Sequence, residues 1–68
     1  MKNWAKVKIV NQNHQALIAK EFLSEHEIES VILNKKDSSY NNFGNYEIFV
    51  PEIEKERALS LINEFLSF

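Results

Sequence analysis

Apolar and polar residues alternate along the first ten positions of the chain. The side expected to be buried carries Ala5, Val7 and Ile9, and the opposite side carries Trp4, Lys6 and Lys8. A period of two residues predicts a strand with one buried face. Polar residues 11–13 end this strand, and either Asn in that run is suited to cap a following helix.

Apolar residues then recur every three or four positions over residues 14–25. The stripe that they form consists of Ala16, Ala19, Phe22 and Leu23. This spacing predicts an amphipathic helix, and Leu17, on its polar side, is expected to be partly exposed. The helix ends near His26 and Glu27 without the Gly that commonly follows a helix. A left-handed residue there would therefore carry a cost of about 1 kcal/mol.

Two further strands are predicted over residues 28–34 and 46–50. In the later strand, Tyr46, Ile48 and Val50 share one face, while Glu47 and Phe49 share the other. The facing of the earlier strand is less decided. We favour the phase in which Ile28, Ser30 and Ile32 face the helices and Val31 and Leu33 face away, but the opposite phase, with Ile32 facing away, stays open.

A second helix is predicted to open at Pro51, because the first helical position needs no N–H group. Glu52, Glu54 and Glu56 would then lie near the positive end of its dipole. Its buried stripe is expected to consist of Ala58, Leu61, Ile62 and Phe65. We expect Arg57 to pair with a neighbouring Glu rather than to bind an anion.

The order strand–helix–strand–strand–helix predicts a single α+β domain over residues 1–68. A right-handed crossover leaves one position between the first two strands, and the third strand fills it. The result is a three-stranded antiparallel sheet of order 1-3-2 with two helices on one face. This is a ferredoxin-like βαββα sandwich without its fourth strand, and the first strand is left as an open edge.

Three segments of the chain resemble one family of small bacterial domains. The opening 3–7 is similar to a family start "NWVKV", segment 28–40 to "GIxAVILNKxDSSY", and segment 47–62 to "EVYVPEE…AL.LI". The family is the prokaryotic signal-transducing domain family, which has no assigned activity. The chain departs from the pattern at Glu27, where the branch has Gly, and at Lys55, where it has Ala.

The resemblance implies the same βαββα ferredoxin-like fold. The family's signalling label rests on its likeness in fold to the trimeric PII nitrogen regulators. Because a fold does not fix a function, the resemblance carries no catalytic residue over to this chain.

Composition narrows the possible functions. The net charge of −2 makes a strongly basic nucleic-acid binder improbable, and a hydrophobic content of 44% excludes intrinsic disorder. No apolar run is long enough to span a membrane, and the start lacks the apolar core of a signal peptide, so a cytoplasmic location is expected. The absence of Cys excludes disulfides and thiolate metal sites.

The polar loop after the second predicted strand is the first candidate site. It brings together two cations, a carboxylate, two hydroxyls and a phenol in Lys35, Lys36, Asp37, Ser38, Ser39 and Tyr40. Loops held by a rigid sheet often bind ligands, here an anionic metabolite or nucleotide. The alternative, which we favour, is local: Asp37 and Ser38 bond their own backbone.

The uncovered face of the sheet is the second candidate. This face is expected to carry Trp4, Lys6, Lys8, Glu47 and Phe49, together with Val31 and Leu33 or, in the other phase, Ile32. The residues most suited to a contact are Trp4, Lys6, Lys8 and Phe49. Aromatic residues interleaved with lysines can stack on RNA bases, but the chain is acidic and has no RNA-recognition signature. A face this apolar is more simply explained by burial against a second subunit or under the chain's own tail.

No constellation predicts catalysis or a metal site. His14 and His26 lie near opposite ends of one predicted helix, a spacing that suits no metal, and we expect no cofactor. A chain of 68 residues without disulfides gains little net stability from its core. We therefore expect a small regulatory or interaction module that self-associates, most simply as a homodimer, with an unidentified protein as another possible partner. The alternative is a small-ligand sensor acting through the loop of residues 35–40.

Overall fold

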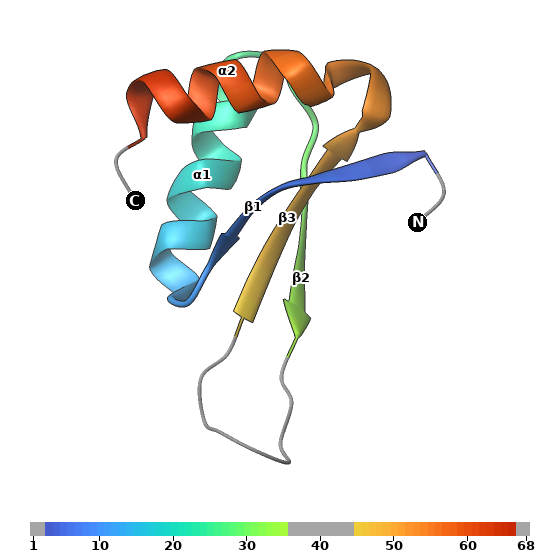
Figure 1. Cartoon of the computed structure of the whole chain (residues 1–68). Coiled ribbons are helices and arrows are strands. Elements are labelled where there is room, and N and C mark those ends of the chain that lie inside the picture. The colour runs from blue at the N-terminus through green and yellow to red at the C-terminus, as the bar shows by residue number, and fades with distance from the viewer. Residues whose placement is uncertain (1–2, 36–44, 67–68) are drawn as a thin grey trace.

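The computed structural model describes residues 3–35 and 45–66 of the chain. Its elements are β1 (Trp4–Val10), α1 (Asn13–Glu25), β2 (Val31–Lys35), β3 (Asn45–Pro51), the 3₁₀ turn η1 (Glu52–Glu54) and α2 (Lys55–Phe65). The three strands form one antiparallel sheet in the order β1-β3-β2. The predicted α+β class, strand order and strand directions are therefore confirmed (Figure 1).

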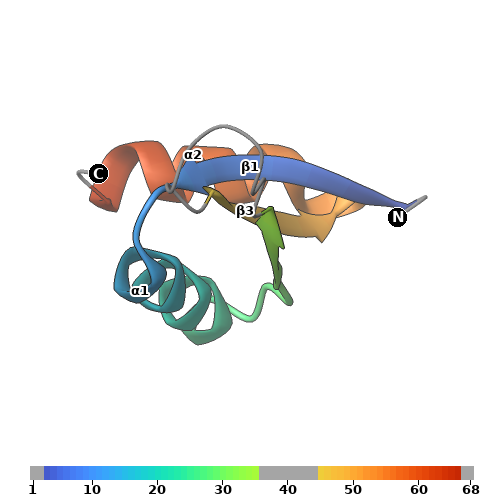
Figure 2. The same ribbon diagram turned by 90° about the horizontal axis from the view of Figure 1, so that it is seen from below.

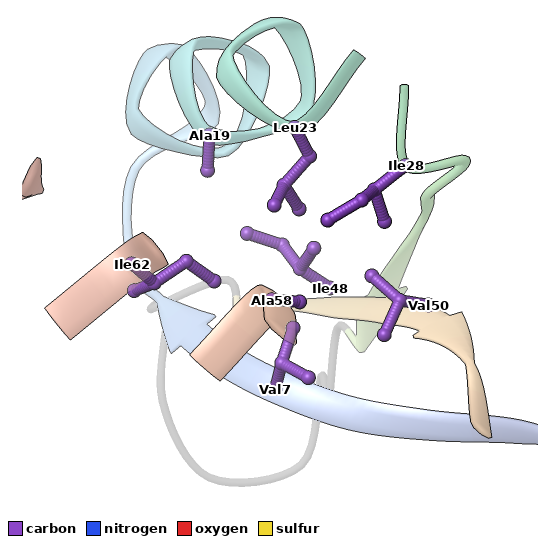
Figure 3. Packing of buried hydrophobic residues seen from close by; sticks show 8 residues of the cluster. All are labelled: Val7, Ala19, Leu23, Ile28, Ile48, Val50, Ala58 and Ile62. Carbon is purple, nitrogen blue, oxygen red and sulfur yellow. The ribbon is translucent and has the colours of Figure 1, made fainter. Parts of the chain in front are cut away.

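Both helices cover the same face of the sheet. Side chains of α1 and α2 enter one core cluster together with strand residues, as Figure 3 shows around Ile48. The cluster consists of Val7, Ala19, Leu23, Ile28, Ile48, Val50, Ala58 and Ile62. Ala16 and Ala19 are completely buried, so these two small residues let α1 lie close against the sheet.

A β-bulge in β1 corrects the predicted alternation of that strand. The pairing with β3 shifts between Lys6 and Lys8, so Lys8 lies opposite the buried Ile48. One extra residue in a strand reverses the facing of the residues that follow. Ile9, which the alternation placed in the core, is accordingly 51% exposed, and Val10 is buried in its place.

The favoured facing of the segment before and within β2 is confirmed. Ile28 and Ser30 are buried, and Ile32 packs against the core cluster. The predicted strand over 28–34 begins too early, however, because β2 starts at Val31.

The end of α1 is a Schellman motif, in which two backbone N–H groups return to the last turn of the helix. Glu27 N–H donates to the carbonyl of Ser24 and Ile28 N–H donates to that of Leu23, both at 2.9 Å. Glu27 adopts the left-handed conformation with φ 63°, so a non-Gly residue does bear the steric cost of this helix exit. At the other end of α1, the N-cap position is Gln12, which makes no side-chain cap bond, so the prediction of an Asn cap is wrong.

The second helix begins later than predicted. Pro51 is the last residue of β3, and η1 precedes α2, which starts at Lys55. Pairing continues just past the strand, because Glu52 N–H donates to the carbonyl of Asn3 at 2.9 Å. Of the predicted stripe, Ala58 and Ile62 are buried and Leu61 is partly buried, whereas Phe65 is 62% exposed. Figure 2 shows α1 and α2 running in different directions beside the strands.

Candidate functional site

The strand register defines the sheet face that neither helix covers. Directly opposite residues share a face of an antiparallel sheet, so Lys6, Phe49 and Val31 form one row across β1, β3 and β2. The next row contains Ile9, Glu47 and Leu33. Trp4 lies opposite Pro51 at the end of the face. We call this set of eight residues the open face.

The open face is mainly apolar and is not fully exposed. Trp4, Val31, Leu33, Phe49 and Pro51 are each half-buried, and Ile9 is about half exposed. These side chains lie over three consecutive rows of the sheet, so they form one continuous surface. This surface is therefore the candidate contact site of the domain.

An ion pair lies within this apolar surface. Lys6 Nζ is 3.6 Å from Glu47 Oε2, and the two groups come from neighbouring rows on adjacent strands. Such diagonal neighbours are within reach of each other when the side chains are long. The Glu47 side chain is 15% exposed and that of Lys6 is 45% exposed. The Glu47 carboxylate is therefore largely shielded from water on this face, while the Lys6 ammonium remains in contact with water.

The structure brings most of the predicted sheet-face residues together. Lys6 and Phe49 are direct register partners, and Trp4 lies on the same face. Lys8 does not share that face, because the bulge places it opposite Ile48. Ile9 takes a place on the open face instead. The sequence does not predict that Ile9 lies on this face, because the alternation of apolar and polar residues continues without a break across the bulge.

The edge of β1 is a less suitable contact than the open face. This edge carries a bulge together with Lys6 and Lys8. Bulges and lysines are the devices by which natural sheets keep edge strands from pairing with other chains. Of the two predicted contacts, the strand edge and the sheet face, the structure thus favours the face.

The predicted ligand loop falls almost entirely outside the described residues. Lys35 is the last residue of β2, and Lys36, Asp37, Ser38, Ser39 and Tyr40 lie outside the part of the chain that the structure describes. The hypothesis of an anion site in this loop therefore stays a prediction.

The remaining chemistry-bearing residues make structural contacts. Arg57 lies 3.6 Å from Glu54, which confirms the predicted pairing with a neighbouring Glu, and Arg57 Nη2 also donates to the carbonyl of His26 at 2.8 Å. The His26 ring packs edge-on against Phe22, with ring centroids 4.7 Å apart. His14 is exposed. Over residues 3–35 and 45–66 there is no group of three or more His, Asp or Glu arranged to hold a metal ion.

A second apolar surface lies on the outer side of α1. Leu17 is 52% exposed, as expected from its position, and Ile18 is 48% exposed. Together with Lys20, Glu21 and Ser24 they line a shallow, open hollow. All of these residues belong to one helix, so the hollow is a feature of the helix surface rather than an enclosed site.

Neither helix in the described part of the chain has the length and apolar character needed to cross a bilayer. No protein-family model, curated protein or solved structure matches the chain.

Proposed function

We propose that this protein is a small interaction module that self-associates as a homodimer through its open face. The observation that carries the proposal is the continuous apolar surface of Trp4, Ile9, Val31, Leu33 and Phe49 on the side of the sheet without helices. In a domain of this size, covering such a surface adds apolar burial that the core alone does not supply. The proposal extends to the fold class, a ferredoxin-like unit whose fourth strand is missing.

The chemistry of the open face favours a second copy as its occupant. Homodimers with two-fold symmetry use the same surface on both subunits, which must therefore complement itself. Among the side chains that the structure describes on this face, the charged groups are one cation, Lys6, and one anion, Glu47; Lys35 ends β2 in the next row, opposite Asn45. The Lys6–Glu47 pair carries one charge of each sign and so complements its own copy, whereas charges of one sign would repel it.

The size of the open face sets the expected strength of association. Three strands with about five residues each cover a footprint of roughly 14 by 17 Å, or about 240 Å². This area is well below the roughly 800 Å² that each partner buries in a standard interface. The homodimer is therefore expected to be in exchange with the monomer rather than permanent. Regulation by concentration is a natural property of such a module.

Sedimentation velocity over a range of protein concentrations tests this proposal. We expect a monomer–dimer transition between about 1 µM and about 1 mM, which corresponds to association free energies of about −8 to −4 kcal/mol. Trp4→Ala and Phe49→Ala should each shift the transition to higher concentration. Leu17→Ala, which removes an exposed apolar side chain on the outer side of α1, is the matched control and should leave it unchanged.

A monomer over the whole range would overturn the proposal and leave the open face to a different protein or to a ligand. The same follows if Leu17→Ala weakens association as much as Trp4→Ala does. Circular dichroism of each variant shows whether a loss of association reflects a loss of folding.

A further inference from the structure

We propose that Lys6 and Glu47 fix the orientation of the homodimer by pairing across its two-fold axis, Lys6 of each copy with the partner's Glu47. The inference rests on the proposed self-association and adds the residues that determine how two copies dock. It starts from the position of the ion pair, in which Glu47 lies on the central strand β3 and Lys6 reaches it from the edge strand β1.

The geometry of the pair suits this exchange. In a two-fold interface, if residue i of one copy contacts residue j of the other, then j also contacts i. When the two-fold axis lies in the interface between Lys6 and Glu47, at right angles to the line that joins them, rotation places the partner's Lys6 over Glu47 and the partner's Glu47 over Lys6. Two charges that lie side by side within one copy then become a square of four alternating charges in the dimer.

The environment of Glu47 gives this arrangement a physical reason. Its carboxylate is largely withdrawn from water, and an ionised carboxylate has acceptor positions for several donors. The distance of 3.6 Å to Lys6 Nζ is longer than a strong charge-assisted hydrogen bond. A second ammonium from the partner would therefore find acceptor positions that the first does not fill.

The charges would contribute orientation more than affinity. An apolar face can dock on its own copy in many orientations at a similar free energy. Lysines and carboxylates within such a face penalise every arrangement that places like charges together or leaves a charge buried without a partner. We therefore expect Lys6 and Glu47 to select one arrangement from those that the apolar residues allow.

Mixing two charge-reversed variants tests the inference. Lys6→Glu carries two carboxylates on the open face and Glu47→Lys carries two ammonium groups, so the pair within each chain is lost in both. Each homodimer should dissociate at least about tenfold more readily than the wild type, because like charges face each other. An equimolar mixture restores opposite charges only between chains, and its heterodimer should be within about threefold of the wild type.

Neutral variants repeat the test if a charge-reversed chain fails to fold. A mixture of Lys6→Gln and Glu47→Gln retains one intermolecular pair, whereas each homodimer retains none. The mixture should therefore associate more tightly than either variant alone. Isotope-labelling one of the two chains lets native mass spectrometry count heterodimers separately from homodimers.

The outcomes separate this inference from the proposed function. Preferential heterodimers support the exchange of partners between Lys6 and Glu47. A wild-type chain that dimerises, with variant mixtures that show no preference for heterodimers, overturns the inference and leaves self-association standing. A wild-type chain that stays monomeric overturns both.

Discussion

The guanidinium of Arg57 in α2 donates a hydrogen bond to the carbonyl oxygen of His26 at the C-terminal end of α1, at 2.8 Å. The last carbonyls of a helix have no partner within the helix and carry the negative end of its dipole. A cation from α2 therefore satisfies one of them and stabilises the dipole. Phe22 and Phe65, with ring centroids 6.0 Å apart, join the same two helices nearby.

Replacing Arg57 by Ala is expected to lower the free energy of unfolding by about 1 kcal/mol, the usual value of such a hydrogen bond near the surface. Urea denaturation measures this change. Glu54→Ala is the matched control, because it removes the ion pair with Arg57 and keeps the bond to His26. It should cost less than about 0.5 kcal/mol. Equal losses in the two variants would show that the ion pair, not the cap, is what stabilises the helix end.

Glu27→Gly is expected to raise the free energy of unfolding by about 1 kcal/mol, because Gly adopts a positive φ without the steric cost that Glu bears. Glu27 also places a negative charge beside the negative end of the α1 dipole. Glu27→Gln removes that charge and keeps the side-chain bulk, so it separates the two effects. If Glu27→Gln stabilises the fold as much as Glu27→Gly does, the charge rather than the backbone conformation is responsible.

The bulge in β1 shows where the sequence stops being informative about the fold. Hydrophobic periodicity was sufficient for the number, type and order of the elements, because both helices and all three strands bury a recognisable stripe. A bulge changes the facing of every later residue in its strand, and no Gly marks this one. Ile9 and Val10 are both large and apolar, so the pattern alone does not decide which of them is buried.

Pro51 illustrates the same limit at an element boundary. The fixed φ of Pro51 is compatible both with the first position of a helix and with the last position of a strand. Because Pro51 pairs with Trp4 of β1, it belongs to the strand. For the candidate site, the pattern placed all but one of the expected residues on the open face correctly, namely Trp4, Lys6, Glu47, Phe49, Val31 and Leu33, and only Lys8 wrongly. It did not identify the ion pair to Glu47, which depends on the register between β1 and β3.

The Ser30 hydroxyl is, among the side chains that the structure describes, the one buried polar group without a hydrogen-bond partner. Burying an unsatisfied hydroxyl costs about 1–3 kcal/mol. Ser30→Ala is therefore expected to be stabilising by about 1 kcal/mol in thermal or urea unfolding. The Lys20 ammonium bonds the Ser30 backbone carbonyl at 2.8 Å, and this contact survives the substitution. A loss of stability of similar size would mean that the hydroxyl does have a partner.

Leu23 and Leu17 provide a matched pair of substitutions within α1. Leu23 is completely buried and Leu17 is 52% exposed. Leu23→Ala is expected to cost about 2–5 kcal/mol, through lost burial and the cavity left behind, which approaches the whole stability of a domain of this size. Leu17→Ala should cost less than about 0.5 kcal/mol. Similar losses for both would contradict the placement of α1 on the sheet.

Trp4 reports on the open face directly, because it is the single Trp of the chain and is half-buried there. Indole emission moves to shorter wavelength when water leaves its surroundings. If two copies cover their open faces, the emission of the wild type should move to longer wavelength on dilution, at the same concentrations at which the dimer dissociates by sedimentation. Lys6→Glu should show the emission of the dissociated state at concentrations where the wild type is associated, and mixing it with Glu47→Lys, which carries the same Trp4, should shift the emission of both chains back to the shorter wavelength of the dimer. Emission that is independent of concentration, in a chain that does dimerise, would place the interface away from Trp4.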